Sequence, residues 1–349
     1  MSSLVLIVPG SLEILTGGYG YDRRMVAGLR ARGWSVAVRQ LDGSFPLPTS
    51  TARDDASRVL AAIPDGTTVL VDGLALGALP EEIERETARL RLVALIHHPL
   101  AAETGLPPDV AARLETGERR ALAAVRLVIV TSGATADALT DYRVDRRRIA
   151  IVEPGTDRAP LARGSRGPAL HLLCVATLIP RKGHEILFRA LAEIPNRNWR
   201  LTCVGSAGRD PRTATDLCAQ LGTYALANRV KLAGEADGAA LAAHYDGADA
   251  FVLASLHEGY GMAVAEALAR GLPIVSTAVG AIPELVGRDG GLVVPPGDVQ
   301  ALADALVQVL GDARVRDRLR RGAELVRTRL PTWDDAVAKM ADTVTMRRP

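Results

Sequence analysis

Aromatic side chains, cysteines and long apolar runs are scarce in this sequence, and each scarcity excludes a class of protein. Aromatic residues make up 3% of the 349 residues, so a nucleic-acid surface built on stacked rings is not expected. No apolar run reaches the roughly 18 residues that a bilayer-spanning helix requires. The first ten residues lack the basic and apolar regions of a signal peptide. We therefore expect a cytoplasmic protein without a membrane span.

The few cysteines also indicate a reducing compartment. There are three, Cys174, Cys203 and Cys218, an odd number without the C-x-x-C or metal-type spacing of a structural site. Cys174 and Cys203 fall in apolar runs. We expect all three to be small core residues of a cytosolic protein.

The charges are closely balanced. The 42 basic and 40 acidic residues give a net charge of +2, too little for a general polyanion binder, so nucleic acid is not an expected partner. Arg143 and Arg146–Arg148 form a local basic cluster. Such a cluster indicates a solvated face or, alternatively, contact with an anionic acceptor or membrane surface, and peripheral membrane contact is not predicted from it.

Short apolar runs alternate with helical patterns along the whole chain, which predicts parallel sheets of the doubly wound α/β class. The length favours two domains. A segment rich in Arg, Gly and Pro, Asp157–Pro168, is typical of a linker between them. The predicted strands are residues 4–8, 36–39, 68–72, 92–96, 127–131, 149–152, 171–175, 200–204, 230–232, 250–253, 274–276 and 292–294.

Two acidic residues stand out in the stretch Asp249–Thr277, which is predicted to form strand, loop, helix and strand. Glu258 lies in a glycine-containing loop, where backbone N–H groups can approach a ligand. Glu266 follows eight residues later, and eight helical steps of about 100° leave about 80° between the side chains. Both carboxylates can therefore face one crevice. The alternative is that Glu258 is a surface charge and Glu266 a solvated helix residue.

Cationic and imidazole side chains follow two other predicted strands. Arg181 and Lys182 come between a strand and a helix, where they can bind phosphate or, alternatively, form solvated surface. His97 and His98 follow the strand that ends at Ile96. They are expected near a ligand lying across the sheet, with His97 preferred, although a single histidine there is often a capping or core residue.

Glycines follow the first predicted strand, in a loop that contains Gly17 and Gly18. The loop lacks the G-x-G-x-x-G spacing and the following acidic residue of a dinucleotide site, so NAD binding is disfavoured. A flexible turn is the alternative interpretation. No D-x-D with the flanking pattern of a metal-bound diphosphate site follows a strand, so we expect neither metal nor cofactor.

The segment EGYGMAVAE, from Glu258 to Glu266, resembles the E-x7-E motif of retaining glycosyltransferases of family 4. The resemblance continues through ALARGLPIVSTAVGAIPELV and GGLVVPPGD, and more weakly at ATLIPRKGH. It implies the GT-B fold, two Rossmann-like domains facing a cleft. On that basis residues 1–160 would bind the acceptor, residues 161–330 would bind the nucleotide sugar, and a helix in residues 331–349 would cross back to the first domain.

The resemblance also implies roles for the candidate residues. Glu258 would contact the donor sugar, Glu266 the ribose, and His97 or His98 the face of the reacting carbon. The remaining implied donor contacts are Gly17, Gly18, Thr177, Arg181, Lys182, Gly259, Tyr260, Gly261 and Met262.

Thr177 stands where this family usually has an arginine, five residues before Lys182. Three outcomes remain open at that position. Arg181 reaches the diphosphate instead, or the Thr177 hydroxyl and the two glycines contribute more, or donor turnover is weak.

The sequence thus predicts a metal-independent retaining glycosyltransferase that moves a sugar from a UDP-, GDP- or ADP-linked donor to an acceptor hydroxyl. Two alternatives remain open at this point. One is a sugar-nucleotide epimerase or hydrolase of the same fold. The other is a non-catalytic sugar-nucleotide-binding partner subunit.

Overall fold

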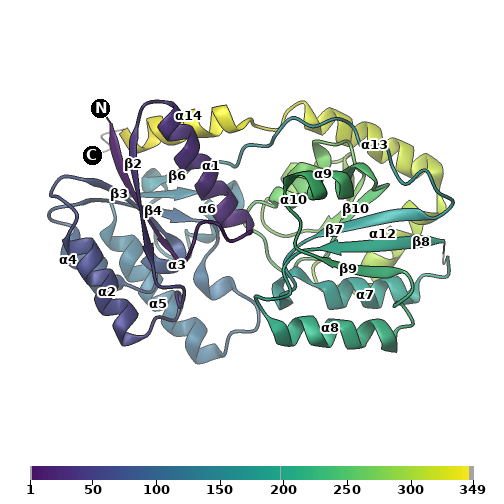
Figure 1. Cartoon of the computed structure of the whole chain (residues 1–349), viewed down its shortest axis with the longest axis horizontal. Coiled ribbons are helices and arrows are strands. Elements are labelled where there is room, and N and C mark those ends of the chain that lie inside the picture. The colour runs from purple at the N-terminus through teal and green to yellow at the C-terminus, as the bar shows by residue number, and fades with distance from the viewer. Residues whose placement is uncertain (1, 197, 346–349) are drawn as a thin grey trace. The chain divides into compact units, whose positions relative to one another are not determined.

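The computed structural model describes residues 2–196 and 198–345 and divides the chain into two compact units (Figure 1). The first unit contains Met1–Gly155 and Pro331–Pro349, and the second contains Thr156–Leu330. The irregular segment that follows Gly155 is hydrogen-bonded to the second unit. The Ala162 N–H, for example, donates to the Arg270 carbonyl at 2.9 Å.

The first unit is built on a parallel six-stranded sheet in the order β2-β1-β3-β4-β5-β6. The order reverses between β1 and β3, and ligands of open α/β sheets bind outside the carboxyl ends of the strands at such a point. The strands are β1 (Ser3–Pro9), β2 (Ser35–Leu41), β3 (Thr68–Asp72), β4 (Arg91–Ile96), β5 (Leu127–Val130) and β6 (Ile149–Ile151).

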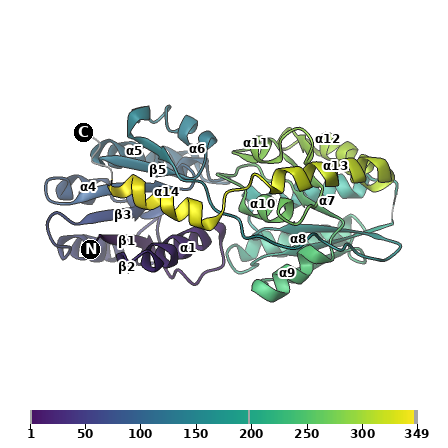
Figure 2. The same cartoon turned by 90° about the horizontal axis from the view of Figure 1, so that it is seen from above.

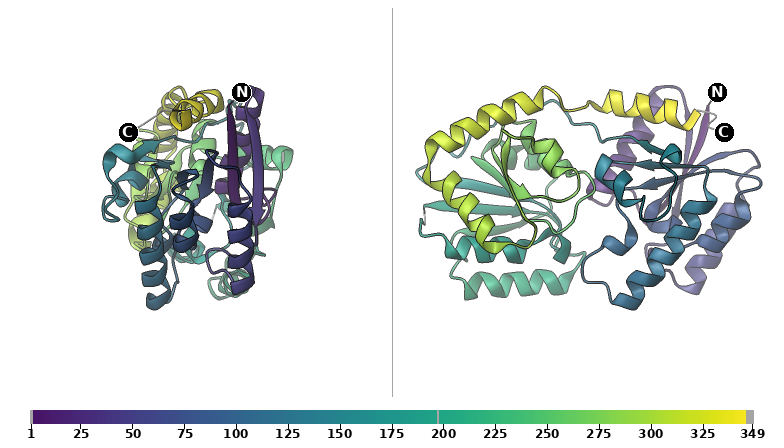
Figure 3. Two further views of the ribbon diagram at one scale, coloured as in Figure 1. Left: turned by 90° about the vertical axis from the view of Figure 1, so that its left-hand side faces the viewer. Right: turned by 180° about the vertical axis from the view of Figure 1, so that it is seen from behind.

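Helices cover both faces of this sheet, and the last helix of the chain is one of them (Figures 1 and 2). It packs against the first helix, where the rings of Tyr21 and Trp333 lie 6.1 Å apart. The right-hand view of Figure 3 also shows it beside the N-terminal segment. The helices of this unit are α1 (Gly17–Ala31), α2 (Ser50–Ala61), α3 (Gly73–Leu76), α4 (Pro80–Glu86), α5 (Pro108–Ala124), α6 (Gly133–Ala138) and α14 (Trp333–Thr345).

The second unit has its own apolar core and a parallel six-stranded sheet in the order β12-β11-β10-β7-β8-β9. Its order reverses between β7 and β10. The strands are β7 (Leu170–Val175), β8 (Trp199–Val204), β9 (Val230–Gly234), β10 (Ala250–Leu253), β11 (Ile274–Thr277) and β12 (Gly291–Val294). The helices are α7 (His184–Glu193), α8 (Pro211–Thr223), α9 (Gly238–Asp246), α10 (Met262–Leu268), α11 (Ile282–Val286), α12 (Val299–Gly311) and α13 (Ala313–Arg327).

All the predicted strands are present, and the doubly wound class is confirmed. Two expectations were wrong. Gly17 and Gly18 do not lie in a loop, because the Thr16 hydroxyl caps α1 and the helix already begins at Gly17. Cys218 is exposed on α8, so only Cys174 and Cys203 are core residues. Within residues 2–196 and 198–345, no helix is both long and apolar enough to cross a bilayer.

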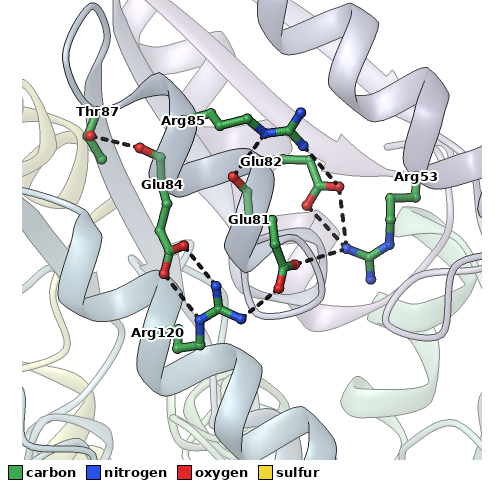
Figure 4. Close-up of polar contacts among 7 residues, drawn as sticks. All are labelled: Arg53, Glu81, Glu82, Glu84, Arg85, Thr87 and Arg120. Carbon is green, nitrogen blue, oxygen red and sulfur yellow. Dashed lines mark hydrogen bonds and ion pairs between the residues drawn. The ribbon is translucent and has the colours of Figure 1, made fainter.

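A network of charged side chains ties α2, α4 and α5 together on the first unit (Figure 4). Arg120 of α5 contacts Glu81 at 2.6 Å and Glu84 at 2.8 Å, both on α4. Arg53 of α2 contacts the buried Glu82 at 3.1 Å. Exposed pairs such as those of Arg120 contribute about 0 to 1 kcal/mol each, so the network mainly fixes how the helices align.

Glu118 of α5 is a fully buried acid, and it makes the stability of the first unit depend on pH. Its Oε2 accepts the Leu100 N–H at 3.0 Å. Burial raises its pKa to about 8, although the hydrogen bonds from Leu100 and Tyr142 act in the opposite direction. Because the pKa of Glu118 is raised in the folded protein, its protonation stabilises the fold fully below pH 4.5, the ordinary pKa of glutamate. This contribution to stability is lost as the pH rises through about 8.

Replacing Glu118 by glutamine is expected to increase the free energy of unfolding at neutral pH. Each pH unit above the unfolded-state pKa of Glu118 lowers the free energy of unfolding of the wild type by about 1.4 kcal/mol. The glutamine variant avoids this loss, so its advantage over the wild type approaches about 3 kcal/mol at pH 7 and is small near pH 5. Urea denaturation at several pH values measures it. The exposed Glu13→Gln is the matched control. If the difference in free energy of unfolding between Glu118→Gln and the wild type did not change between pH 5 and 8, the raised pKa of Glu118 would be contradicted.

Candidate functional site

The loop between β10 and α10 carries Glu258, which is buried with 7% of its surface exposed. The Ser255 hydroxyl donates to its Oε1 at 2.7 Å. Ser255 is itself held, because its carbonyl accepts the Thr277 hydroxyl at 2.6 Å. Glu258 is therefore a fixed, buried group at the carboxyl end of β10, and it is not a solvated loop charge.

Both predicted cations approach this carboxylate from the loop after β7. A 3₁₀ turn, Pro180–Lys182, places the Lys182 Nζ 2.6 Å from Oε1 of Glu258. Arg181 lies with a guanidinium nitrogen 4.0 Å from Oε2 of Glu258 and donates to the His257 carbonyl at 3.1 Å. The acid and the two cations thus meet at the β7/β10 reversal of strand order, where this class of sheet binds its ligands.

Two glycines make this approach possible. Gly183 has φ +65°, and a Cβ there would lie 2.0 Å from the Ala254 carbonyl oxygen. Gly280 has φ +53°, and a Cβ there would lie 2.0 Å from the Glu258 carbonyl oxygen. Since a real side chain cannot come so near, both positions require glycine to bring the Lys182 turn and the Glu258 loop together.

The cations determine the charge of Glu258. Burial by itself would raise its pKa, but the charges of Lys182 and Arg181 and the hydrogen bonds from Lys182 and Ser255 outweigh burial, so the pKa lies below its ordinary value. The carboxylate is ionised at neutral pH. A bound anion can draw Lys182 away from Glu258, and that carboxylate can then accept hydrogen bonds from a ligand.

Glu266 lies on α10 and is held by a residue that the sequence did not indicate. The Tyr245 hydroxyl donates to Oε2 of Glu266 at 2.9 Å, and the Arg270 guanidinium lies 4.5 Å from the centre of the Tyr245 ring. The pKa of Glu266 lies above its ordinary value because the effect of burial exceeds the opposite effects of the Tyr245 hydrogen bond and the Arg270 charge. Tyr245 precedes Glu266 by 21 residues on a different helix, so no local pattern connects them.

The other predicted donor residues of the second unit lie in the same two loops. Thr177 is half-buried after β7, before the turn that carries Lys182. Tyr260 and Gly261 are buried and Gly259 and Met262 are partly exposed, immediately after Glu258. The structure therefore brings together the predicted residues of this unit around the ends of β7 and β10.

The first unit gathers its own predicted residues at the carboxyl ends of β1 and β4. His97 follows β4 and packs beside α1, where a Cβ on Gly18 would lie 3.4 Å from the His97 ring. Gly17 is the first residue of that helix. His98 turns to a different partner, because its Nε2 lies 3.7 Å from Glu103. The two histidines thus have separate surroundings.

Two clusters within residues 2–196 and 198–345 could offer ligands to a metal ion. One joins His97 with Asp22 and Asp72, and the other joins His184 with Cys174 and Cys203. In the second cluster the Cys174 sulfur lies 3.8 Å from the His184 Nε2 behind the Lys182 turn. Neither cluster includes Glu258 or Lys182, so neither is placed to hold a metal between a diphosphate and these cations.

A cavity of about 570 Å³ lies in the second unit but away from this chemistry. Its lining includes His171, Arg200 and Lys231, which lie near the amino ends of β7, β8 and β9. Parallel α/β sheets bind ligands at the opposite, carboxyl ends. We therefore place the candidate site at Glu258 and Lys182 rather than in this cavity.

Two doubly wound parallel-sheet domains in one chain are the architecture of the GT-B class. Over 98% of both chains, the structure is similar to sucrose-phosphate synthase from Thermosynechococcus elongatus, with a TM-score of 0.83 and 21% identity. It is also similar to Anabaena Alr3699/HepE in complex with UDP-glucose, with a TM-score of 0.79 and 18% identity over 99% of this chain and 100% of that one. These likenesses support the fold.

Sequence comparison gives the family. The family Glycosyl transferases group 1 matches residues 169–312, and Glycosyltransferase Family 4 matches residues 67–159. The first match covers most of the second unit and the second match covers about half of the first unit, and the chain belongs to the family 4 glycosyltransferases. The resemblance of the E-x7-E segment and the GT-B expectation are thereby confirmed.

Curated relatives add two comparisons. D-inositol 3-phosphate glycosyltransferase of Corynebacterium efficiens is 33% identical over 218 residues, 56% of this chain and 51% of that protein. MMP alpha-(1->4)-mannosyltransferase of Mycolicibacterium hassiacum is 28% identical over 314 residues, 84% of this chain and 74% of that protein. The chain thus spans about half the length of the first of these relatives.

Proposed function

We propose that this chain is a retaining glycosyltransferase that transfers a sugar from a nucleoside diphosphate donor to an acceptor hydroxyl without a metal ion. The observation that carries the proposal is the ion pair between Lys182 and the buried Glu258 at the β7/β10 reversal, 2.6 Å apart. A transferase must stabilise charge on the leaving diphosphate and hold the sugar, and this pair supplies one group for each task.

Each candidate residue has one role in this proposal. Lys182 and Arg181 neutralise the diphosphate as its bond to the sugar breaks. Glu258 accepts hydrogen bonds from the donor sugar, and Glu266, held by Tyr245, accepts them from the ribose. The remaining donor contacts come from Thr177, Gly259, Tyr260, Gly261 and Met262 in the second unit and from Gly17 and Gly18 in the first.

The first unit would bind the acceptor, with His97 rather than His98 near the reacting carbon. No side chain needs to act as the base, because an oxygen of the departing phosphate can take the acceptor proton. The names of the relatives support a sugar donor and a hydroxyl acceptor, since they include an inositol phosphate glycosyltransferase and a mannosyltransferase. A structural neighbour in complex with UDP-glucose supports a nucleotide-linked sugar.

Calorimetry with UDP, GDP and ADP, followed by turnover of the matching donor sugars, tests this function. We expect one nucleoside diphosphate to bind and its sugar to be transferred to a member of a mixed acceptor pool, detected by mass spectrometry. Transfer should persist in excess EDTA, because side-chain cations take the place of Mg²⁺. Nucleotide release without a glycosylated product would indicate a hydrolase or epimerase, and binding without turnover would indicate a sensor or partner subunit.

A further inference from the structure

Two buried carboxylates face the same edge of the His97 ring. Oδ1 of Asp22, on α1, lies 3.5 Å from Nε2 of His97, and Oδ2 of Asp72, at the end of β3, lies 3.6 Å from the same nitrogen. Asp22 is 1% exposed and Asp72 is 2% exposed. Three elements of the first unit therefore converge on one ring nitrogen.

Asp22 has no evident structural task apart from this contact. Across residues 2–196 and 198–345, neither of its carboxylate oxygens has a hydrogen-bond partner of ordinary geometry. A buried carboxylate without a partner is costly, so its charge must be balanced by a nearby cation or it must be protonated. His97 is the cation-forming group in contact with it.

Asp72 is fixed in position by a second contact. Its Oδ1 accepts the Leu74 N–H at 2.8 Å and so caps α3, while its Oδ2 is directed to His97. The helix cap thus holds this carboxylate against the imidazole. The two acids thus approach the ring from different elements, α1 and the end of β3.

The other contacts of His97 involve its ring and its backbone carbonyl, and none of them is a hydrogen bond to Nε2. The centres of the Tyr21 and His97 rings lie 5.4 Å apart in a T-shaped arrangement, and the hydroxyls of Thr131 and Thr135 donate to the His97 carbonyl at 3.4 and 3.5 Å. Burial, and secondarily the Asp22 charge, raises the pKa of Tyr21 well above its ordinary value, so Tyr21 stays neutral. The titratable groups that face the ring are therefore Asp22, Asp72 and Tyr21.

These surroundings favour a charged imidazole. Burial of His97 disfavours the charge, but Asp22 and then Asp72 outweigh burial, and the pKa of His97 lies above its ordinary 6.5. Since 3.5 Å is long for a hydrogen bond, we attribute the effect of Asp22 mainly to its charge. Burial and then the Asp22 charge raise the pKa of Asp72 above its ordinary value, while the charge of His97 opposes them.

We propose that Asp22 and Asp72 are positioning residues that hold the Nε2 edge of His97 between two carboxyl groups, so that the ring meets the donor sugar in one orientation. This inference rests on the proposed function, which puts His97 beside the reacting carbon. With Nε2 facing the two acids, Nδ1 is the ring nitrogen that remains for an oxygen of the sugar. The acids touch no substrate and act only through His97.

NMR titration of the histidine Cε1–H signals, without donor or acceptor, tests whether the two acids act on the His97 ring. The protein has six histidines, and the signal that disappears in His97→Gln identifies His97. We expect the His97 midpoint in the wild type to lie above 6.5. In Asp22→Asn it should fall by about one unit or more, because the amide removes the adjacent charge. The His98 signal should not move.

Controls separate this role from a structural one. Asp54→Asn changes an exposed aspartate of the same unit and should leave the His97 midpoint unchanged. Asp72→Asn is the second variant if Asp22→Asn does not fold, and it should lower the midpoint in the same direction. In the turnover assay, the alkaline limb of the pH–rate profile should move to lower pH by a similar amount in each folded variant.

Three results would overturn the inference. They are a wild-type His97 midpoint below 6.5, a midpoint that neither variant changes, and one equivalent of metal bound to Asp22, Asp72 and His97 in the purified protein. Because the titration contains no donor, it gives its result even if the chain proves not to transfer sugar. A failure of the proposed function is seen separately, in the turnover assay.

Discussion

Replacing Glu258 by glutamine is expected to lower turnover by about 10² to 10³, the scale for removing one contact that strengthens in the transition state. Glutamine keeps the size of the buried side chain and can still accept the Ser255 hydrogen bond, so the loop should hold its shape. What is lost is the negative charge beside the sugar. Affinity for the free nucleoside diphosphate should be retained, because Lys182 is then released from its partner.

Steady-state kinetics and calorimetry on the same preparation measure the two effects. Glu193→Gln, at the exposed end of α7 in the same unit, is the matched control and should behave like the wild type. If Glu258→Gln weakened nucleotide binding and left turnover unchanged, Glu258 would be a binding residue of a sensor. The proposed role in transfer would then be wrong.

Replacing Lys182 by methionine should affect both stability and turnover. The variant leaves the buried Glu258 with Arg181 at 4.0 Å as its remaining close cation. Breaking a buried pair from one side costs about 3 to 5 kcal/mol, and we expect the lower end because the Lys182 side chain is 18% exposed. Turnover should fall by about 10² or more, since the leaving diphosphate loses a charge-assisted contact.

The stability loss should depend on pH in a defined direction. In the wild type the lowered pKa of Glu258 contributes stability above the ordinary value of 4.5, and this is lost as the pH falls through the folded-state pKa. The deficit of Lys182→Met should therefore be largest near pH 7 and shrink as the pH falls through the folded-state pKa of Glu258, below which this carboxyl group is protonated in both the folded and the unfolded protein. Denaturation at several pH values measures it, with the exposed Lys231→Met as control.

The double variant Lys182→Met, Glu258→Gln separates the two effects. It removes the uncompensated charge, so it should recover most of the lost stability while turnover stays low. A double variant as unstable as Lys182→Met alone would show that the lysine contributes through packing and not through its charge.

The strands of this fold could be predicted from the sequence because most are short apolar runs, and the central ones, such as β5 and β10, are buried on both faces. The order of the strands could not be predicted, since the pairing of β10 with β7 joins segments about 80 residues apart and depends on how helices pack. The beginning of α1 was missed because two glycines suggested a loop. The Thr16 cap offsets their poor helix propensity.

The site was predictable where its residues follow strands or share a helix. Glu258, Glu266 and Lys182 each lie at such positions. Asp22 and Tyr245 were missed for a different reason. Each lies within a helix whose local pattern gives a buried polar group no distinguishing mark, and each meets its partner only through tertiary packing.

The most direct measurement is a crystal structure of the protein with the nucleotide sugar that calorimetry selects. The proposal predicts diphosphate oxygens within about 3 Å of the Lys182 Nζ. It also predicts a sugar hydroxyl on the Glu258 carboxylate and ribose on Glu266. A nucleotide bound elsewhere, with Lys182 and Glu258 still paired only to each other, would contradict the assignment of this site to the donor.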